Sequence, residues 1–217
     1  DLETKEEDFV TQLLTTNTHS DLLFFTNKGK AYQIKMYELP EGKRATKGKS
    51  IMNYLSLGGD ESVTSILAVP KSAKAEKASL MLVTKKGVAK KVSYESFKDV
   101  RRSGIIAIRL DAGDELEAVL RVHKGQSVIL ATSEGQSIRF DEADIREMGR
   151  TAGGVRAMKL GKHDKLICAD VIESEEKTYM LIMGENGIGK KTAIKEYKIQ
   201  KRGGSGIKTA KITTKTG

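Results

Sequence analysis

Residues 80–110, LMLVTKKGVAKKVSYESFKDVRRSGIIAIRL, contain the pattern on which the whole chain is built. An apolar run ends at a turn glycine, Gly87, and an alternating arm follows it. A second glycine, Gly104, then precedes another alternating run. Short apolar or alternating runs bounded by glycine are typical of β-strands, and two of them across a glycine turn predict a hairpin. The stretch therefore predicts β-structure rather than helix.

The same pattern occurs three more times, in residues 22–55, 128–160 and 179–212. The turn glycines are Gly29, Gly87, Gly135 and Gly187, and the second glycines are Gly48, Gly104, Gly154 and Gly206, which follow after 19, 17, 19 and 19 residues. Self-similarity at steady offsets is the signature of a repeat architecture. We expect one domain over residues 1–217, with repeats at approximately 21–69, 79–122, 126–172 and 178–217.

Each repeat is expected to supply four strands. After the hairpin, the third strand is predicted from SIMNYL (50–55), IIAIRL (105–110), VRAMKL (155–160) and IKTAKI (207–212). The fourth is predicted from VTSILAV (63–69), LEAVLRV (116–122) and LICADVI (166–172). Four strands in about 50 residues, repeated, predict an all-β, propeller-like fold of about four four-stranded blades. A bulky residue ten positions past each turn glycine is predicted to anchor the core: Leu39, Phe97, Ile145 and Tyr197.

The composition favours a polyanionic partner. The net charge is +9 and the pI is near 9.4, which suits nucleic acid or an anionic membrane surface, although a merely basic soluble protein is the alternative. Cys168 is the single cysteine and lies in an apolar run, so we expect a buried, inert thiol and a reducing, cytosolic setting. The three histidines lie apart from any ligand-spaced partner, so neither a metal nor a cofactor is expected. No apolar run is long enough to span a membrane.

One stretch resembles a nucleotide-binding loop. GENGIGKK (184–191) has the first seven positions of a P-loop, but Lys191 stands where a magnesium-binding hydroxyl belongs. The residues that follow predict a strand instead of the required helix, and Gly187 falls on the repeat turn. We interpret the stretch as a turn. No nucleophile and base recur at matched positions either, so no catalytic residue is predicted.

The basic residues recur near the second glycine of every repeat. They are Arg44, Lys47, Lys49, Arg101, Arg102, Arg150, Arg156, Lys201 and Arg202. A propeller places equivalent loops of successive blades along one edge, so these cations predict a curved positive stripe. Neighbouring glycines let backbone amides approach phosphates. The alternative is that the charges are ordinary loop residues and the glycines serve only the turn.

The predicted contact is neutral to base sequence. The chain has no recognition helix, no zinc-finger spacing, and few aromatic residues to stack on bases. The mode that remains is binding to the backbone of duplex DNA, which depends on charge and curvature.

The heptapeptide QKRGGSG (200–206) resembles the box that marks the C-terminal domain of the DNA gyrase A protein, and other segments of the chain are similar to that family throughout. The box-like residues are Gln200, Lys201, Arg202, Gly203, Gly204, Ser205 and Gly206. The resemblance implies a β-pinwheel whose blades exchange a strand with their neighbours. It also implies DNA wrapping that supports negative supercoiling in the bacterial cytoplasm. The implied partners are the remainder of the gyrase A protein and the ATPase protein of an A2B2 holoenzyme. The catalytic tyrosine and the ATPase site would lie outside this chain.

Two departures from the family pattern matter. The family's box usually lies in the first blade, whereas the box-like stretch here belongs to the fourth repeat, so we expect a fragment that lacks the usual first-blade box and the last blade or blades. The related domain of topoisomerase IV is one alternative, although the well-formed QKRGGSG favours gyrase. A propeller used as a protein-interaction platform is the other alternative, and it would predict hydrophobic loop tips.

Overall fold

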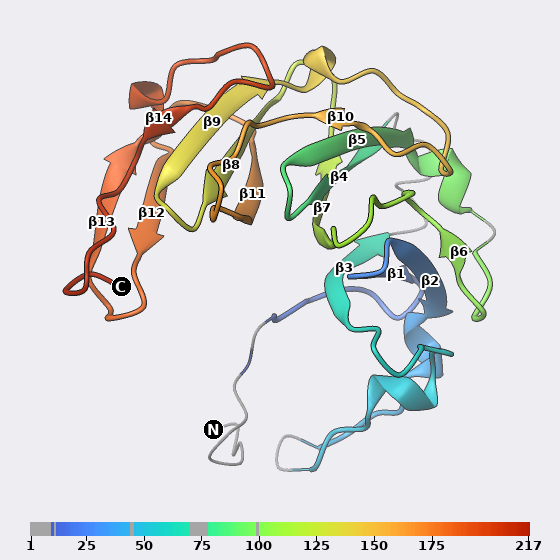
Figure 1. Cartoon of the computed structure of the whole chain (residues 1–217). Helices are drawn as coiled ribbons and strands as arrows, with labels where there is room; N and C mark the ends of the chain where they lie inside the picture. The colour runs from blue at the N-terminus through green and yellow to red at the C-terminus, as the bar shows by residue number, and fades with distance from the viewer. Residues whose placement is uncertain (1–9, 11, 44–45, 70–77, 99) are drawn as a thin grey trace.

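The computed structural model describes residues 10, 12–43, 46–69, 78–98 and 100–217. In this part of the chain the regular structure consists of β-strands and short 3-10 turns, which confirms the all-β class. The sheets follow one another along an open, propeller-like arc, from β1–β3 at one end to β12 and β13 at the other (Figure 1). No helix within the described ranges is long and apolar enough to cross a membrane.

Each repeat begins with the predicted hairpin. The hairpins are β1 (Asp21–Thr26) with β2 (Lys30–Lys35), β4 (Ser79–Thr84) with β5 (Val88–Ser93), β8 (Ser127–Thr132) with β9 (Gln136–Asp141), and β12 (Tyr179–Met183) with β13 (Gly189–Ala193). Their registers are antiparallel, with Leu82 opposite Lys90 in the second hairpin, for example. The stretch that resembled a P-loop is the turn between β12 and β13 and no helix follows it, as predicted.

The other strands also lie where the sequence placed them, but one group is short. The fourth strands are β3 (Val63–Val69), β7 (Leu116–Val122) and β11 (Leu166–Ile172), which match the prediction residue for residue. The third strands are only two residues long: β6 (Ile105–Ile106), β10 (Val155–Arg156) and β14 (Ile207–Lys208). Each hairpin is followed by a 3-10 turn: η1 (Met36–Glu38), η4 (Tyr94–Phe97), η5 (Glu142–Asp144) and η6 (Ile194–Glu196).

The third strands of the second, third and fourth repeats each pair with the hairpin of the preceding repeat. The sheets have the orders β3-β1-β2-β6, β7-β4-β5-β10 and β11-β8-β9-β14, and β12 pairs with β13 in a two-stranded sheet. We call these sheets blades one to four, and β6, β10 and β14 the exchanged strands. Three described blades therefore have four strands, and the exchange that the family resemblance implied is present.

One predicted strand is wrong. SIMNYL (50–55) forms no strand but contains the 3-10 turn η2 (Ile51–Asn53). The exchanged strands need the hairpin of a preceding repeat as their partner, and no such hairpin precedes this segment in the described chain. Ile51, Tyr54 and Leu55 instead pack on the face of blade one that carries Leu22 and Phe24.

The core lies between the blades, because the first strands of the first three hairpins, β1, β4 and β8, are buried on both faces, whereas alternate residues of β12 are exposed. In β4, Leu80 and Leu82 pack toward blade one, whereas Met81 and Val83 pack toward blade three. A strand with a period of two and apolar residues on both faces suits this position. The predicted anchors Phe97, Ile145 and Tyr197 are buried, and Leu39 is half-buried against the core of blade one.

Candidate nucleic-acid interface

The exchanged strands lie at the outer edge of the arc. Strand β3 contacts β7, and β7 contacts β11, so the fourth strands of neighbouring blades meet on the inner side. Because each exchanged strand is at the opposite edge of its sheet, β6, β10 and β14 lie on the outside (Figure 1). We call this outer edge, together with the loops at residues 100–104, 148–154 and 199–206 that lead into it, the rim.

The turn glycines hold the exchanged strands in place. The carbonyl oxygen of Gly87 accepts hydrogen bonds from the N–H groups of Ala157 (2.8 Å) and Met158 (3.1 Å). Equivalent pairs of bonds run from Ala107 and Ile108 to Gly29 and from Thr209 and Ala210 to Gly135. A Cβ on Gly87 would lie 2.7 Å from the Met158 carbonyl oxygen, and the φ angle of Gly87 is +78°, so no other residue suits the position. The turn glycine therefore determines where the next rim segment docks.

The second glycine brings the rim loop down onto the preceding blade. Gly206 has a φ of +73°, and a Cβ there would lie 2.1 Å from the Ser137 carbonyl oxygen. Gly48, the second glycine of the first repeat, has no atom within 4 Å of such a Cβ. This difference agrees with the absence of an exchanged strand in residues 50–55.

The predicted cations fall into two groups. Arg101, Arg102, Arg150, Arg156, Lys201 and Arg202 lie on the rim, and Lys47 and Lys49 lie in an exposed loop that carries no exchanged strand. Arg44 lies outside the described residues. The structure thus places six of the nine predicted residues along one outer edge that spans three successive blades.

Several rim cations already have protein partners. Arg102 forms an ion pair with Glu38, and Lys201, whose side chain is 90% exposed, lies 3.0 Å from an Asp144 carboxylate oxygen. The half-buried Arg202 donates from Nε to the Asp144 carbonyl oxygen (2.9 Å) and from its guanidinium to the Arg156 carbonyl oxygen (2.9 Å). Arg202 therefore braces the rim, whereas Lys201 extends into solvent.

The box-like motif forms a junction between neighbouring repeats. The Gln200 N–H donates to the Arg139 carbonyl oxygen (2.7 Å), and the Gly203 N–H donates to the Ala157 carbonyl oxygen (2.5 Å). The Gly204 carbonyl oxygen in turn accepts from the Lys159 N–H (2.9 Å). The backbone of the motif is thus bonded to blade three and to the preceding exchanged strand.

The sequence reasoning missed a second set of matched cations. Arg109, Lys159 and Lys211 each lie five residues past a second glycine, and all three are exposed. The backbone of this position is fixed, because the Arg109 N–H donates to the Ala152 carbonyl oxygen (3.2 Å), as the Lys159 N–H does to Gly204. Counting from the second glycine could have found them, but the first repeat has Asn53 at this offset.

Three other basic side chains are buried between blades and do not belong to the rim. Lys91 forms an ion pair with Glu142 of the next repeat. Arg139 donates to the Ser127 hydroxyl (2.8 Å) and the Tyr197 carbonyl oxygen (3.2 Å). Lys90, which is fully buried, contacts carbonyl oxygens of a rim loop. These cations join neighbouring repeats and contribute to the net charge without being exposed.

The hairpin turns carry cations that acidic side chains compensate. Lys28 lies 2.7 Å from Asp60, and Lys85 lies 2.5 Å from Glu115. The hydrogen bond and charge of Asp60 raise the pKa of Lys28, and the Lys28 ammonium in turn lowers the pKa of Asp60. The charges of Lys28 and Lys85 are thus compensated by carboxylates, whereas the side chains of Arg109 and Arg156 lie exposed.

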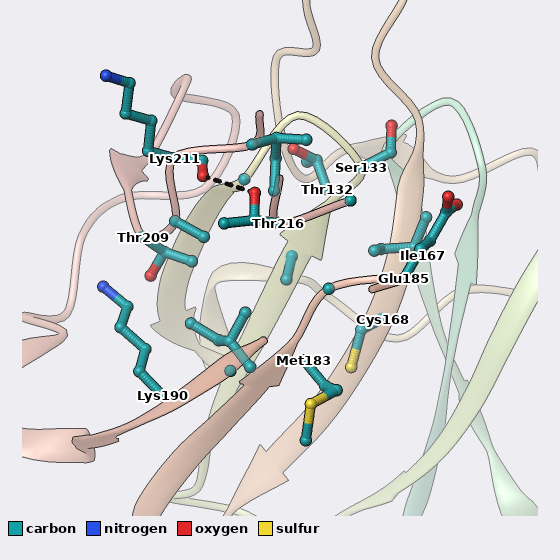
Figure 2. Close-up of a pocket in the computed structure, with 18 of the residues that line it drawn as sticks. Thr132, Ser133, Ile167, Cys168, Met183, Glu185, Lys190, Thr209, Lys211 and Thr216 are labelled. Atoms are coloured by element: carbon teal, nitrogen blue, oxygen red, sulfur yellow. Dashed lines mark hydrogen bonds between the residues drawn. The ribbon is translucent and has the colours of Figure 1, made fainter. Parts of the chain in front are cut away.

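A cavity of about 540 Å³ lies between blades three and four. Figure 2 shows Ile167 and Cys168 of β11 facing Met183 of β12 across it. Cys168 is exposed, so the predicted burial of this thiol is wrong: the pairing register shifts between Leu166 and Cys168, and this part of β11 borders the cavity instead of a packed blade. No hydrogen bond joins the thiol to a base, and no metal-binding cluster occurs, in the described part of the chain.

A series of antiparallel blades that exchange strands, with cations along the outer edge, defines a propeller-like repeat domain. The chain belongs to the family described as DNA gyrase C-terminal domain, beta-propeller, which it matches over residues 20–70, 78–123, 126–173 and 178–215.

Known proteins agree with this assignment. The chain is 41% identical over 216 residues to the A subunit of DNA gyrase from Staphylococcus epidermidis and, equally, to the one from Staphylococcus aureus. It spans only 24% of the length of these relatives. Among solved structures, it is similar to the C-terminal domain of DNA topoisomerase IV (TM-score 0.83, 26% identity, 95% of this chain and 64% of that one). It is also similar to the DNA gyrase A C-terminal domain (TM-score 0.78, 29% identity, 93% and 64%).

Proposed function

We propose that this chain binds duplex DNA through the rim, without regard to base sequence, and wraps it around the outside of the arc. The observation that carries the proposal is the repetition of exposed cations at one offset, three residues past the end of each exchanged strand: Arg109, Lys159 and Lys211. Lysine and arginine that follow a curved edge suit the phosphate backbone of a bent duplex, and such contacts fix position without reading sequence.

The larger role follows from the family. In a gyrase-type enzyme of the bacterial cytoplasm, the wrapped segment would present DNA with a fixed handedness to the rest of the gyrase A protein, which would form an A2B2 assembly with an ATPase protein. Negative supercoiling would be the outcome. The chain would contribute DNA binding and no bond-breaking chemistry, with no cofactor of its own. The 41% identity to gyrase A supports gyrase over topoisomerase IV.

A protein-interaction platform is the weaker alternative. It would need a mainly apolar rim. Ile106, Ile199 and Ile207 are exposed there, but they are separated by the exposed cations Arg101, Arg102, Arg156 and Lys201.

DNA binding is tested by its dependence on salt. If rim cations neutralise phosphates, the logarithm of the association constant falls linearly with the logarithm of salt concentration, by about 0.9 for each phosphate contact. Titrations of a mixed-sequence duplex and of an unrelated duplex should give the same steep slope. A slope near zero would overturn the proposal, and a large difference between the duplexes would indicate base readout.

Wrapping needs a separate test. The protein is bound to nicked circular DNA, the nick is ligated, and the linking number is read on a gel after deproteinisation. We expect a shift of one sign that grows with the amount of protein bound. Binding without a shift would limit the function to DNA binding.

A further inference from the structure

A buried lysine lies directly beneath one rim loop. Lys90 of β5 is fully buried, and its ammonium donates to the carbonyl oxygens of Gly149 (3.1 Å), Arg150 and Ala152 (3.0 Å). These three bonds use all the donors of an ammonium group. The buried charge therefore depends on this loop of the following repeat for its solvation.

The same three bonds determine where the amide groups of the loop point. In a trans peptide the C=O and N–H groups point in opposite directions, and the described chain contains no cis peptide bond. Because the carbonyl groups of Gly149, Arg150 and Ala152 point inward at Lys90, the N–H groups of Arg150, Thr151 and Gly153 point away from it. Gly149 and Thr151 are exposed and Arg150 and Gly153 are half-buried. Within the described residues, none of the three N–H groups has a backbone acceptor.

The loop also lies among rim cations. The Ala152 carbonyl oxygen accepts a second hydrogen bond, from the Arg109 N–H, which brings the exposed Arg109 beside the loop. Arg156 follows in β10 and is exposed as well. Backbone N–H groups that have no acceptor within the protein and lie among cations can donate to phosphate oxygens.

We propose that residues 149–153 contact the phosphate backbone of DNA through the outward N–H groups of Arg150, Thr151 and Gly153, and that Lys90 is the positioning residue that holds the loop in this orientation. The inference rests on the proposed DNA binding and assigns a role to a residue that never touches DNA. The corresponding position, three residues past the turn glycine, is Tyr32 in blade one, Ile138 in blade three and Lys190 in blade four. Lys190 is exposed, so among the described blades only the second has a buried lysine here.

The charge on Lys90 can change under mild conditions. Burial and, to a smaller extent, the nearby Arg150 guanidinium together lower the pKa of Lys90 to about 8. Arg150 is the charged side chain that acts on the ammonium, and an arginine keeps its charge at this pH. A bound phosphate would favour the charged form, so binding would take up a proton near this pH.

The test is a double-mutant cycle on the full chain with a mixed-sequence duplex. Lys90→Met keeps the shape of the side chain and removes the ammonium. We expect a loss of affinity of about tenfold, as for one hydrogen-bonded contact to a charged group. Arg150→Ala should weaken binding too, but its effect should be largely absent in the Lys90→Met background. Lys201 lies on another repeat. The fold-losses of affinity caused by Lys201→Ala and Lys90→Met should therefore multiply in the double variant.

A pH series gives an independent measurement. Wild-type affinity should fall as the pH rises through about 8, whereas the affinity of Lys90→Met should not change over that interval. If Lys90→Met does not fold, replacement of the Thr151 amide by an ester removes one N–H group and keeps every side chain. Weaker binding by the ester variant supports the site, and unchanged binding overturns it.

The outcomes separate this inference from the proposed function. No salt-dependent binding by the wild-type chain would overturn the proposed function itself. Two results would overturn only the inference about the loop, given normal binding by the wild-type chain. One is an unchanged affinity of Lys90→Met, and the other is that the fold-losses of affinity of Lys90→Met and Arg150→Ala multiply in the double variant.

Discussion

Glu61 shows how a single buried carboxylate supports the rim. It accepts hydrogen bonds from the Thr26 hydroxyl (2.6 Å), the Tyr32 hydroxyl (2.9 Å) and the Gly58 N–H (3.0 Å). The Tyr32 ring lies directly under Gly104, where a Cβ would come within 2.5 Å of it. Burial raises the pKa of Glu61, but these hydrogen bonds outweigh it, so the pKa is lower than that of an ordinary glutamate.

This lowered pKa predicts a dependence of stability on pH. A carboxyl group whose pKa is depressed by folding stabilises the protein above its unfolded pKa and loses that contribution as the pH falls. We therefore expect Glu61→Gln to lower the free energy of unfolding at neutral pH, and the gap from wild type to close on acidification. Chemical denaturation at a series of pH values measures this, with Glu196→Gln, at an exposed position, as the control. Parallel curves for wild type and Glu61→Gln would contradict it.

Lys201 and Arg202 are adjacent in the sequence but should differ in effect. Lys201→Ala removes an exposed ion pair, which is worth at most about 1 kcal/mol, so it should weaken DNA binding with little change in stability. Arg202→Ala leaves the carbonyl groups of Asp144 and Arg156 without their donor, so it should lower stability as well as affinity. Thermal unfolding and duplex binding, measured on both variants, distinguish them. Equal stabilities would show that Arg202 does not brace the rim.

At the scale of the strands, the local sequence predicted where strands form but did not predict which strands pair. The apolar runs and turn glycines predicted the hairpins to within a residue or two, and β3, β7 and β11 to the residue. These elements depend on periodicity and turn chemistry, which are local. The partner of each exchanged strand is a non-local choice, because Ile105 and Ile106 pair with Ala31 and Lys30 of another repeat. Only the family resemblance implied that exchange, and periodicity alone wrongly predicted a strand in residues 50–55.

Two turn glycines offer a direct measure of what strand exchange contributes. Gly87 and Gly187 occupy the same hairpin position with φ angles of +78° and +75°. An added Cβ at Gly187 meets nothing within 4 Å, whereas at Gly87 it meets the Met158 carbonyl oxygen at 2.7 Å. Gly187→Ala should cost about 1–2 kcal/mol for the left-handed backbone alone. Gly87→Ala should cost clearly more, since it also displaces β10.

Equilibrium denaturation of these two variants provides the comparison. Because the backbone strain is common to both, the difference between their unfolding free energies reports the docking of the exchanged strand. Equal losses would show that the strand yields freely and contributes little to stability.

Over the whole molecule, the basic side chains differ in whether they are exposed, bonded to the backbone or buried. The sequence predicted the cations near the second glycines, and most of them lie on the rim. It offered no means of telling the exposed Lys201 from the bracing Arg202, or of knowing that Lys90, Lys91 and Arg139 are buried. These distinctions depend on the contacts between neighbouring repeats. Such contacts are non-local, so local sequence patterns do not predict them, just as they did not predict the strand exchange.

The position of the charges, and not the net charge, should therefore decide DNA binding. Replacing Arg109, Lys159 and Lys211, the exposed cations that follow the exchanged strands, with alanine should lower the salt slope by about 0.9 for each phosphate that is no longer neutralised, and should reduce the linking-number shift. The control variant replaces three cations of the hairpin turns, Lys28, Lys85 and Lys86, and so removes the same amount of charge. These lysines already have partners within the protein, namely Asp60, Glu115 and the Ala112 carbonyl oxygen. This control variant should keep the wild-type slope and shift. Equal losses in the two variants would mean that the net charge alone attracts DNA, and the rim would then have no special role.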